Sequence, residues 1–151
     1  MATISVFAER TIAAPAARVY GYIADMRGHH PRFLPPAFLD FRVESGGVGA
    51  GTVTRFKLTA GGRTREYHMT VAEPDPGRVL TESDDSSSLV TTTTVAQRGQ
   101  ASCTVRISAT WAGAPGIGGL FERIFAPRVM RGVYADELDH LAAYVRERDL
   151  G

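Results

Sequence analysis

The stretch LTAGGRTREYHMTV, residues 58–71, decides the fold because it predicts a β-hairpin with a defined register. Two β-rich runs flank a central Gly-Gly dipeptide, which is typical of a two-residue turn. Such a turn pairs Lys57 with Glu66, whereas a three-residue loop would oppose Lys57 to Arg65, two like charges. We therefore expect the two-residue turn and the strand pairing that follows from it.

This register divides the side chains of the hairpin between two faces. Arg55 lies opposite His68, and both are expected on the outer face of the sheet. Arg65 points inward, but it is close to the turn and can reach water. The large apolar residues share the inner face: Phe56, Leu58, Tyr67, Met69 and Val71.

Turn signals divide the rest of the chain into short elements. Residues 4–12 alternate and predict a strand, and Pro15 suits the first turn of a short helix that ends near Asp25. Between Phe38 and Trp111, clusters of Gly, Pro, Asp and Ser separate about six strands of an antiparallel meander. These clusters occupy residues 45–51, 60–63, 74–77, 83–87 and 97–100.

A long C-terminal helix is predicted from about Gly119 to Arg148 by apolar residues at helical spacing. Pro127 lies inside this pattern and predicts a kink or break near Ala126. An antiparallel sheet has one face to bury, and this helix is long enough to cover it. The expected fold class is α+β: a curved antiparallel sheet of about seven strands wraps around the long helix, with two short helices after the first strand.

A second hairpin, TTTTVAQRGQASCTV at residues 91–105, allows two registers. A type I turn with Gly99 as the bulge residue pairs Thr93 with Cys103 and Thr91 with Val105. It adds the hydroxyls of Thr91 and Thr93 to an inner wall of apolar residues. A tighter turn would place Thr92 and Thr94 there instead, and both registers stay open. The apolar residues of this wall are Leu89, Val95, Cys103, Val105, Ile107 and Trp111.

Three motifs and the terminal helix resemble the START-like helix-grip superfamily (SRPBCC), in its bacterial polyketide cyclase/dehydrase and lipid-transport branch. The motifs are TIAAPAARVYGYIAD (11–25), GAGTVTRFKL (49–58) and EPDPGRVLTE (73–82). The resemblance covers nearly the whole chain, so we expect one domain over residues 1–151. It implies an apolar ligand held in a cavity between the sheet and the long helix. The superfamily contains carriers, cyclases, hormone receptors and enzymes, so the resemblance is weak evidence for a particular activity.

The first hypothesis is therefore a carrier or sensor that binds a lipid, a polyketide or an isoprenoid. The alternative is a polyketide aromatase/cyclase or dehydratase acting in the same cavity, with Arg65, Tyr67, Thr91 and Thr93 as its polar groups. Both stay open on the sequence alone. The residues expected to line the cavity are Tyr22, Phe33, Leu34, Phe56, Leu58, Tyr67, Met69, Thr91, Thr93, Val105, Ile107, Trp111, Phe121, Phe125 and Val129.

The stretch DMRGHHPRFLPP, residues 25–36, is the least usual in the chain. Its adjacent histidines suggest a metal site, but neighbouring side chains rarely converge on one ion, and no acidic residue between Asp25 and Asp40 joins them. We expect Phe33 and Leu34 to point inward as a lid. His29, His30 and Arg32 are then expected to face water, and no inward carboxylate–histidine pair is evident.

Composition narrows the partners further. The net charge of +1 does not favour nucleic acid, and no motif implies a cofactor or a metal. Cys103 is the single cysteine, a candidate core thiol, and it fits a reducing cytoplasm. Glu9 and Arg10 come before any apolar run that could act as a signal peptide, and no stretch approaches the length of a transmembrane helix, so we expect a cytoplasmic protein without integral membrane association. A third hypothesis, docking of another protein on the outer sheet face, conflicts with the charged residues Arg55, Lys57, Glu66 and His68. The oligomeric state is not indicated.

Overall fold

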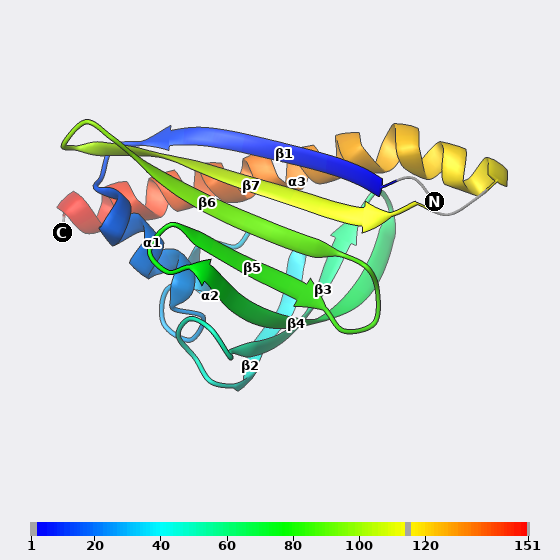
Figure 1. The fold of residues 1–151 in the computed structure, drawn as a ribbon, viewed down its shortest axis with the longest axis horizontal. Helices are drawn as coiled ribbons and strands as arrows, with labels where there is room; N and C mark the ends of the chain where they lie inside the picture. Colours follow the sequence, from blue (N-terminus) through cyan, green and yellow to red (C-terminus); the bar gives the residue numbers. More distant parts are fainter. Residues whose placement is uncertain (1–2, 114–115, 151) are drawn as a thin grey trace.

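The computed structural model describes the backbone of residues 3–113 and 116–150 and the side chains of residues 3–113 and 124–149. A seven-stranded antiparallel sheet has the order β1-β7-β6-β5-β4-β3-β2 (Figure 1). Its strands are β1 (Thr3–Ile12), β2 (Phe38–Ser45), β3 (Val53–Ala60), β4 (Arg63–Asp75), β5 (Val79–Asp84), β6 (Val90–Arg98) and β7 (Ser102–Ala112). The helices are α1 (Ala16–Ala24), α2 (His30–Phe33) and α3 (Gly116–Leu150). The expected α+β helix-grip fold is confirmed.

Helix α3 lies along one face of the curved sheet and is the longest element in Figure 1. Its buried side chains recur at helical spacing and face the sheet: Tyr134, Leu138, Leu141, Tyr144 and Val145. The helix passes through Pro127 as one continuous element, so of the expected kink or break near Ala126 the break does not occur. Packing of the buried residues that follow stabilises the helix beyond the proline. Among the described residues, no helix combines the length and the hydropathy that crossing a bilayer requires.

The hairpin of β3 and β4 has the register that its Gly-Gly turn predicts. Lys57 pairs with Glu66 and Phe56 with Tyr67, and the turn residues Gly61 and Gly62 have φ of 60° and 77°. Positive φ at both positions is the requirement of this tight turn. The five apolar residues expected on the inner face are all buried, so the prediction is confirmed.

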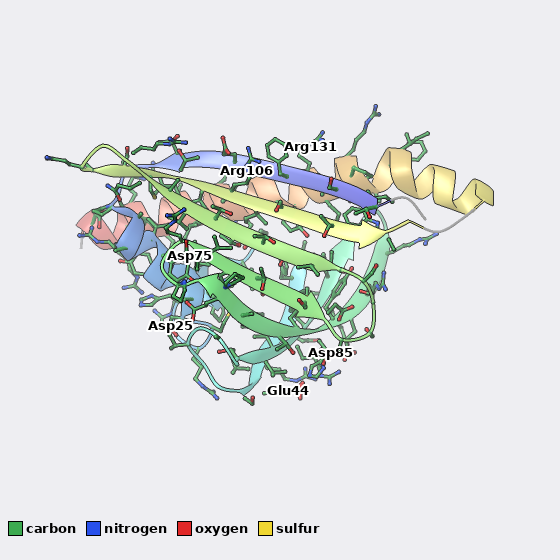
Figure 2. All side chains as sticks on the ribbon, in the orientation of Figure 1. Asp25, Glu44, Asp75, Asp85, Arg106 and Arg131 are labelled. Atoms are coloured by element: carbon green, nitrogen blue, oxygen red, sulfur yellow. The ribbon has the colours of Figure 1, made fainter. Side chains whose placement is uncertain are left out.

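The outer face of the same hairpin is charged, as expected (Figure 2). Arg55 donates from Nε to Glu44 at 2.7 Å and from its terminal nitrogen to Glu66 at 2.6 Å. The Nδ1 atom of His68 lies 2.6 Å from a carboxylate oxygen of Asp85. Docking of another protein on this face would require an apolar patch. These ion pairs instead make the surface of the hairpin charged.

The hairpin of β6 and β7 has a register that differs from both registers considered from the sequence, so both predictions are wrong. Thr93 pairs with Ile107 and Thr91 with Ala109, because the loop lies two residues farther along, at residues 99–101. Arg98 stays in its strand, where its carbonyl accepts a hydrogen bond from the Ser102 hydroxyl at 2.9 Å. The displacement is an even number of residues, so Thr91 and Thr93 keep their inward orientation.

The stretch 25–36 folds back against the sheet and places His30 inside the protein. The carbonyl of Asp25 accepts the backbone N–H of His30 at 2.8 Å, and the residue is only 4% exposed. The expectation that both histidines face water is therefore wrong. His29 is half-buried, and its Nδ1 lies 2.6 Å from the hydroxyl of Tyr144. Each ring has a polar partner inside the fold, which compensates the loss of water.

Candidate functional site

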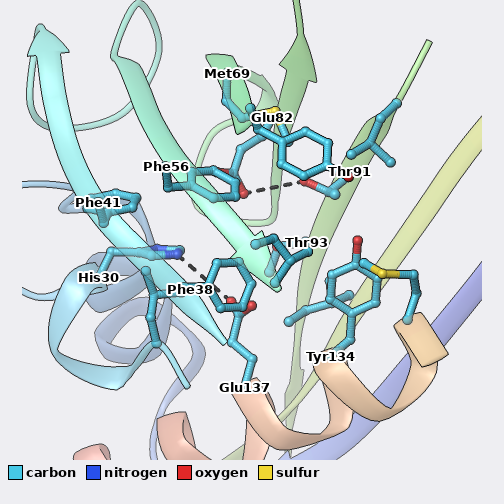
Figure 3. Close-up of a pocket in the computed structure, with 16 residues that line it drawn as sticks. His30, Phe38, Phe41, Phe56, Met69, Glu82, Thr91, Thr93, Tyr134 and Glu137 are labelled. Atoms are coloured by element: carbon cyan, nitrogen blue, oxygen red, sulfur yellow. Dashed lines mark hydrogen bonds and ion pairs between the residues drawn. The ribbon is translucent and has the colours of Figure 1, made fainter. Parts of the chain in front are cut away.

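A narrow cavity of about 40 Å³ lies between the inner face of the sheet and α3 (Figure 3). One wall is aromatic and is formed by Phe38, Phe41, Phe56 and Tyr67. Because one water molecule needs roughly 10–15 Å³, the cavity has room for a few waters. A lipid-sized ligand therefore needs the walls to move, or it needs additional space beside the cavity.

Such space is present in a second hollow of about 360 Å³ that adjoins the first. The two share Leu58, Tyr67 and Met130 as walls. The hollow reaches the turn between β3 and β4, where Arg63 and Arg65 form its rim. An inner cavity and an outer mouth with a cationic rim thus lie end to end along the sheet.

The inner cavity contains His30, whose orientation is set by the backbone. Nδ1 lies 2.8 Å from the carbonyl oxygen of Ile23. Since a carbonyl only accepts, Nδ1 carries the proton, and in the neutral ring Nε2 holds the lone pair. Nε2 lies 3.8 Å from Oε2 of Glu137 on α3 (Figure 3). The expectation of no inward carboxylate–histidine pair is therefore wrong.

Glu137 is a buried carboxyl group, with 8% of the residue exposed. Burial, and then the nearby charge of Glu82, raises the pKa of Glu137 to about 8. At neutral pH the group therefore carries a proton and can donate it. Glu82 lies across the cavity on β5, and its Oε2 accepts from the Thr91 hydroxyl at 3.4 Å.

Two tyrosines add hydroxyl groups to the cavity. Burial, with further contributions from the Glu137 and Glu82 charges, raises the pKa of Tyr134. Burial also raises the pKa of Tyr67, although the Arg65 cation acts in the opposite direction. Both phenols therefore stay protonated at neutral pH and can donate hydrogen bonds to a ligand.

The structure brings most of the predicted site residues together. Eight of them line the inner cavity: Leu34, Phe56, Leu58, Tyr67, Met69, Thr91, Thr93 and Ile107. Phe125 and Val129 line the outer hollow, and so does Arg65. All four proposed polar groups, Arg65, Tyr67, Thr91 and Thr93, thus lie at the two cavities.

Four predicted residues lie outside the lining of these two cavities. The ring of Tyr22 packs against His29 and Tyr144, with centroids 4.7 and 5.5 Å apart. Phe33, 2% exposed, and Val105, 0% exposed, belong to the packed core. Trp111 is half-buried near the end of β7. The side chain of Phe121, which is also on the predicted list, lies outside the described residues.

Several residues that line the inner cavity were not predicted from the sequence, and for one of them the sequence contains a recognisable pattern. Glu137 stands directly before Leu138, one turn after Tyr134, so a carboxyl group interrupts the apolar stripe of α3. His30 left no such signal, because its inward direction depends on the carbonyls of residues 23 and 25. Leu89, expected on the inner wall of the second hairpin, also lines the cavity, and the missed lining residues are His30, Phe38, Phe41, Glu82, Met130, Tyr134 and Glu137.

Potential metal ligands are dispersed in the described part of the chain. No three His, Cys, Asp or Glu side chains there gather around a common point. His29 is directed at Tyr144 and His30 at Glu137, so the two adjacent rings have different partners.

Comparison with known proteins places the fold in a family. The sequence model of the family described as polyketide cyclase / dehydrase and lipid transport matches residues 3–146. The solution structure of the KanY protein is 35% identical, with coverage of 97% of this chain and 99% of that chain and a TM-score of 0.84. No curated protein matches the sequence.

Two more distant structures share the fold. An aromatase/cyclase from Streptomyces sp. R1128 is 16% identical, with a TM-score of 0.77 and coverage of 97% of this chain and 96% of that chain. Norcoclaurine synthase from Thalictrum flavum, in complex with dopamine and hydroxybenzaldehyde, is 22% identical, with a TM-score of 0.71 and coverage of 97% and 88%. Because the family model matches nearly the whole length of this chain, the chain belongs to the polyketide cyclase / dehydrase and lipid transport family, within the START-like helix-grip superfamily.

Proposed function

We propose that the protein binds a hydrophobic small molecule, such as a lipid, a polyketide or an isoprenoid, between the sheet and α3 as a carrier or sensor. The observation that carries this proposal is the pair of adjoining cavities, of which the inner is walled by aromatic rings. The family description, which names lipid transport, supports it. Removing apolar ligand surface from water supplies the driving force.

The shared wall explains how the two cavities can accept a ligand larger than either. Met130 stands between them, and an unbranched methionine side chain adapts its shape readily. Leu58 and Tyr67 lie on β3 and β4, which the sheet holds in place. A ligand that displaces the Met130 side chain therefore joins the outer hollow to the inner cavity while the sheet stays unchanged.

The charge distribution favours one orientation of an amphipathic ligand. Arg63 and Arg65 stand at the rim of the outer hollow, which opens more widely than the inner cavity. The inner end offers the hydroxyls of Tyr134 and Thr93. An anionic end at the mouth and a neutral polar group inside would each meet a complementary partner.

Native mass spectrometry and displacement of a lipophilic dye test the binding function. Thr93→Met fills part of the inner cavity and is expected to weaken dye binding about tenfold, because overpacking opposes ligand entry. Thr92→Met is the matched control, since Thr92 is on the opposite face of β6. No dye uptake by the wild type would contradict the proposal.

A second candidate function, cyclisation or dehydration of a polyketide in the same cavity, is favoured by the buried polar groups at its inner end. The structural neighbour from Streptomyces is named an aromatase/cyclase, and the family description includes cyclases and dehydrases. Comparing product profiles from a polyketide substrate for the wild type, Arg65→Ala and Tyr67→Phe tests the roles first assigned to these residues. Identical profiles would exclude those roles.

A further inference from the structure

The inner end of the cavity is lined by a base and an acid that lie close to each other. The lone pair of His30 Nε2 is directed into the cavity because Nδ1–H is bonded to the Ile23 carbonyl at 2.8 Å. The Glu137 carboxyl group faces it, with 3.8 Å between Nε2 and Oε2. At that separation the two atoms stand side by side, beyond the length of a direct hydrogen bond.

The surroundings keep this pair away from bulk water. His30 and Glu137 are 4% and 8% exposed. The ring of His30 lies 4.7 Å from that of Phe33 and 6.1 Å from that of Phe41, measured between centroids. Such a site holds the acid and the base in fixed positions, and solvent reaches them only slowly between transfers. The fold does not require a carboxyl group at position 137, because an apolar side chain there would pack in the apolar stripe of α3 equally well.

The spacing matches a carbonyl compound that presents an α-hydrogen. The α-carbon and the oxygen of a ketone are about 2.4 Å apart, given C–C and C=O bonds of about 1.5 and 1.2 Å. A base over the α-hydrogen and an acid at the oxygen therefore need to stand a few ångströms apart and to line the same space. Nε2 of His30 and Oε2 of Glu137 are 3.8 Å apart, and both residues line the inner cavity.

We infer that His30 and Glu137 are a catalytic proton-transfer pair that enolises a hydrophobic ketone bound in the cavity. The lone pair of Nε2 takes the α-proton, and the C–H electron pair becomes the C=C bond of the enol. The π pair of the carbonyl moves to oxygen, which takes the proton of Glu137. His30 is left as imidazolium and Glu137 as carboxylate, and the reverse transfer restores both.

This inference rests on the proposed binding of a ligand in the same cavity, and it adds a substrate class. The ligand is an apolar compound with an enolisable carbonyl group. Ring closure by carbon–carbon bond formation and loss of a β-hydroxyl group both begin from such an enol. No redox partner or further reactant is needed for the step.

Deuterium exchange into 2-tetralone, an apolar ketone, tests the step in D₂O by NMR. The wild type is expected to exchange the α-hydrogens faster than solvent alone. Glu137→Gln keeps the shape of the side chain but cannot transfer a proton, and a loss of about 10²-fold is expected. His30→Asn keeps an amide N–H that can donate to the Ile23 carbonyl, but it lacks the Nε2 lone pair. The same loss of exchange rate is expected for this variant.

Matched surface variants control for general effects of each substitution. Glu147→Gln and His140→Asn alter exposed residues of the same helix, outside both cavities, and are expected to leave the exchange rate unchanged. The pH profile separates chemistry from folding. Exchange by the wild type is expected to fall as Glu137 loses its proton, near pH 8, and Glu137→Gln should lack this limb. The other titratable groups that line the same cavity are Glu82, Tyr67 and Tyr134.

The outcomes distinguish this inference from the binding proposal. Displacement of a lipophilic dye by 2-tetralone, with exchange at the solvent rate, would overturn the inference and leave the binding function intact. Equal exchange by the wild type and both cavity variants would overturn it as well. Failure to bind either the dye or the ketone would overturn the binding function and the inference with it.

Discussion

The guanidinium carbon of Arg65 lies 5.5 Å from the centroid of the Tyr67 ring. Tyr67 is a wall of both cavities, while Arg65 is exposed at the rim of the outer one. A cation at this distance is attracted to the ring face, so the contact holds a positive charge beside the path into the apolar interior. The same charge is available to an anionic ligand group.

Replacing Arg65 by alanine is expected to weaken binding of dodecanoate about two- to fivefold and to leave binding of dodecanol nearly unchanged. The loss is small because an exposed ion pair contributes only about 0.2–1 kcal/mol. Isothermal titration calorimetry with the two ligands measures the difference. Arg78→Ala removes an exposed arginine outside both cavities and is the control. Equal losses for acid and alcohol would show that Arg65 supports the wall and does not recognise charge.

Phe33 was expected to act as a lid, but the structure places it in the packed core. It is 2% exposed, and its ring lies 4.7 Å from that of His30 and 5.9 Å from that of Tyr144. Phe33→Ala is therefore expected to lower the free energy of unfolding by about 3–5 kcal/mol. Urea denaturation measures this loss.

Leu34 provides the matched comparison for Phe33. It is half-buried and lines the inner cavity, so Leu34→Ala is expected to reduce ligand affinity more than stability. If Phe33→Ala instead unfolds at the wild-type urea concentration and exchanges ligand faster, the lid hypothesis holds after all.

The two hairpins show which parts of the fold can be predicted from the sequence. In the hairpin of β3 and β4 the turn type and the charge opposition at Lys57 act over a few residues and agree, so the register was predictable. In the hairpin of β6 and β7 the loop around Gly99 fits registers of both parities, one with Thr91 and Thr93 inward and one with Thr92 and Thr94 inward. Neither the pairing nor the choice of inward threonines could therefore be settled from the sequence.

The polar centre of the site depends on contacts that no local pattern records. The direction of the His30 ring is set by a carbonyl in α1 and by a turn at Asp25. Its partner Glu137 comes from α3, at the other end of the chain. Prolines and adjacent histidines instead suggested a solvated loop. A carboxyl group within the apolar stripe of α3 was the available clue, whereas the inward direction of Phe56 and Tyr67 followed from the turn register and the alternation of β3 and β4.

Thr54 carries a buried hydroxyl group for which the described residues offer no hydrogen-bond partner. The residue is 0% exposed, so the oxygen is desolvated without compensation. Thr54→Val is expected to raise the free energy of unfolding by about 1 kcal/mol or more. Thr52 is equally buried, but its hydroxyl accepts the backbone N–H of Gly47 at 3.1 Å. Thr52→Val is therefore expected to lower stability. Urea denaturation of both variants measures the contrast, and a change of the same sign in both would contradict it.

The raised pKa of Glu137 makes stability depend on pH in a defined direction. In the unfolded chain the group loses its proton near the ordinary value of 4.5, whereas in the folded protein it keeps the proton up to about pH 8. Between these values the folded state binds more protons than the unfolded state. The contribution of this group to stability is therefore fully present below pH 4.5 and is lost as the pH rises to 8.

Glu137→Gln removes the titrating group and is expected to remove its contribution to the pH dependence of stability. The unfolding free energy of the wild type should fall relative to the variant by up to about 1.4 kcal/mol per pH unit within the window. The nearby Tyr67 and Tyr134 stay protonated throughout it, because burial raises the pKa of both. Urea denaturation of both proteins at pH 5, 6, 7 and 8 measures the difference, with Glu147→Gln as the exposed control. A difference that stays constant with pH would mean that Glu137 is already ionised in the folded protein, and it could not then act as the acid of the pair with His30.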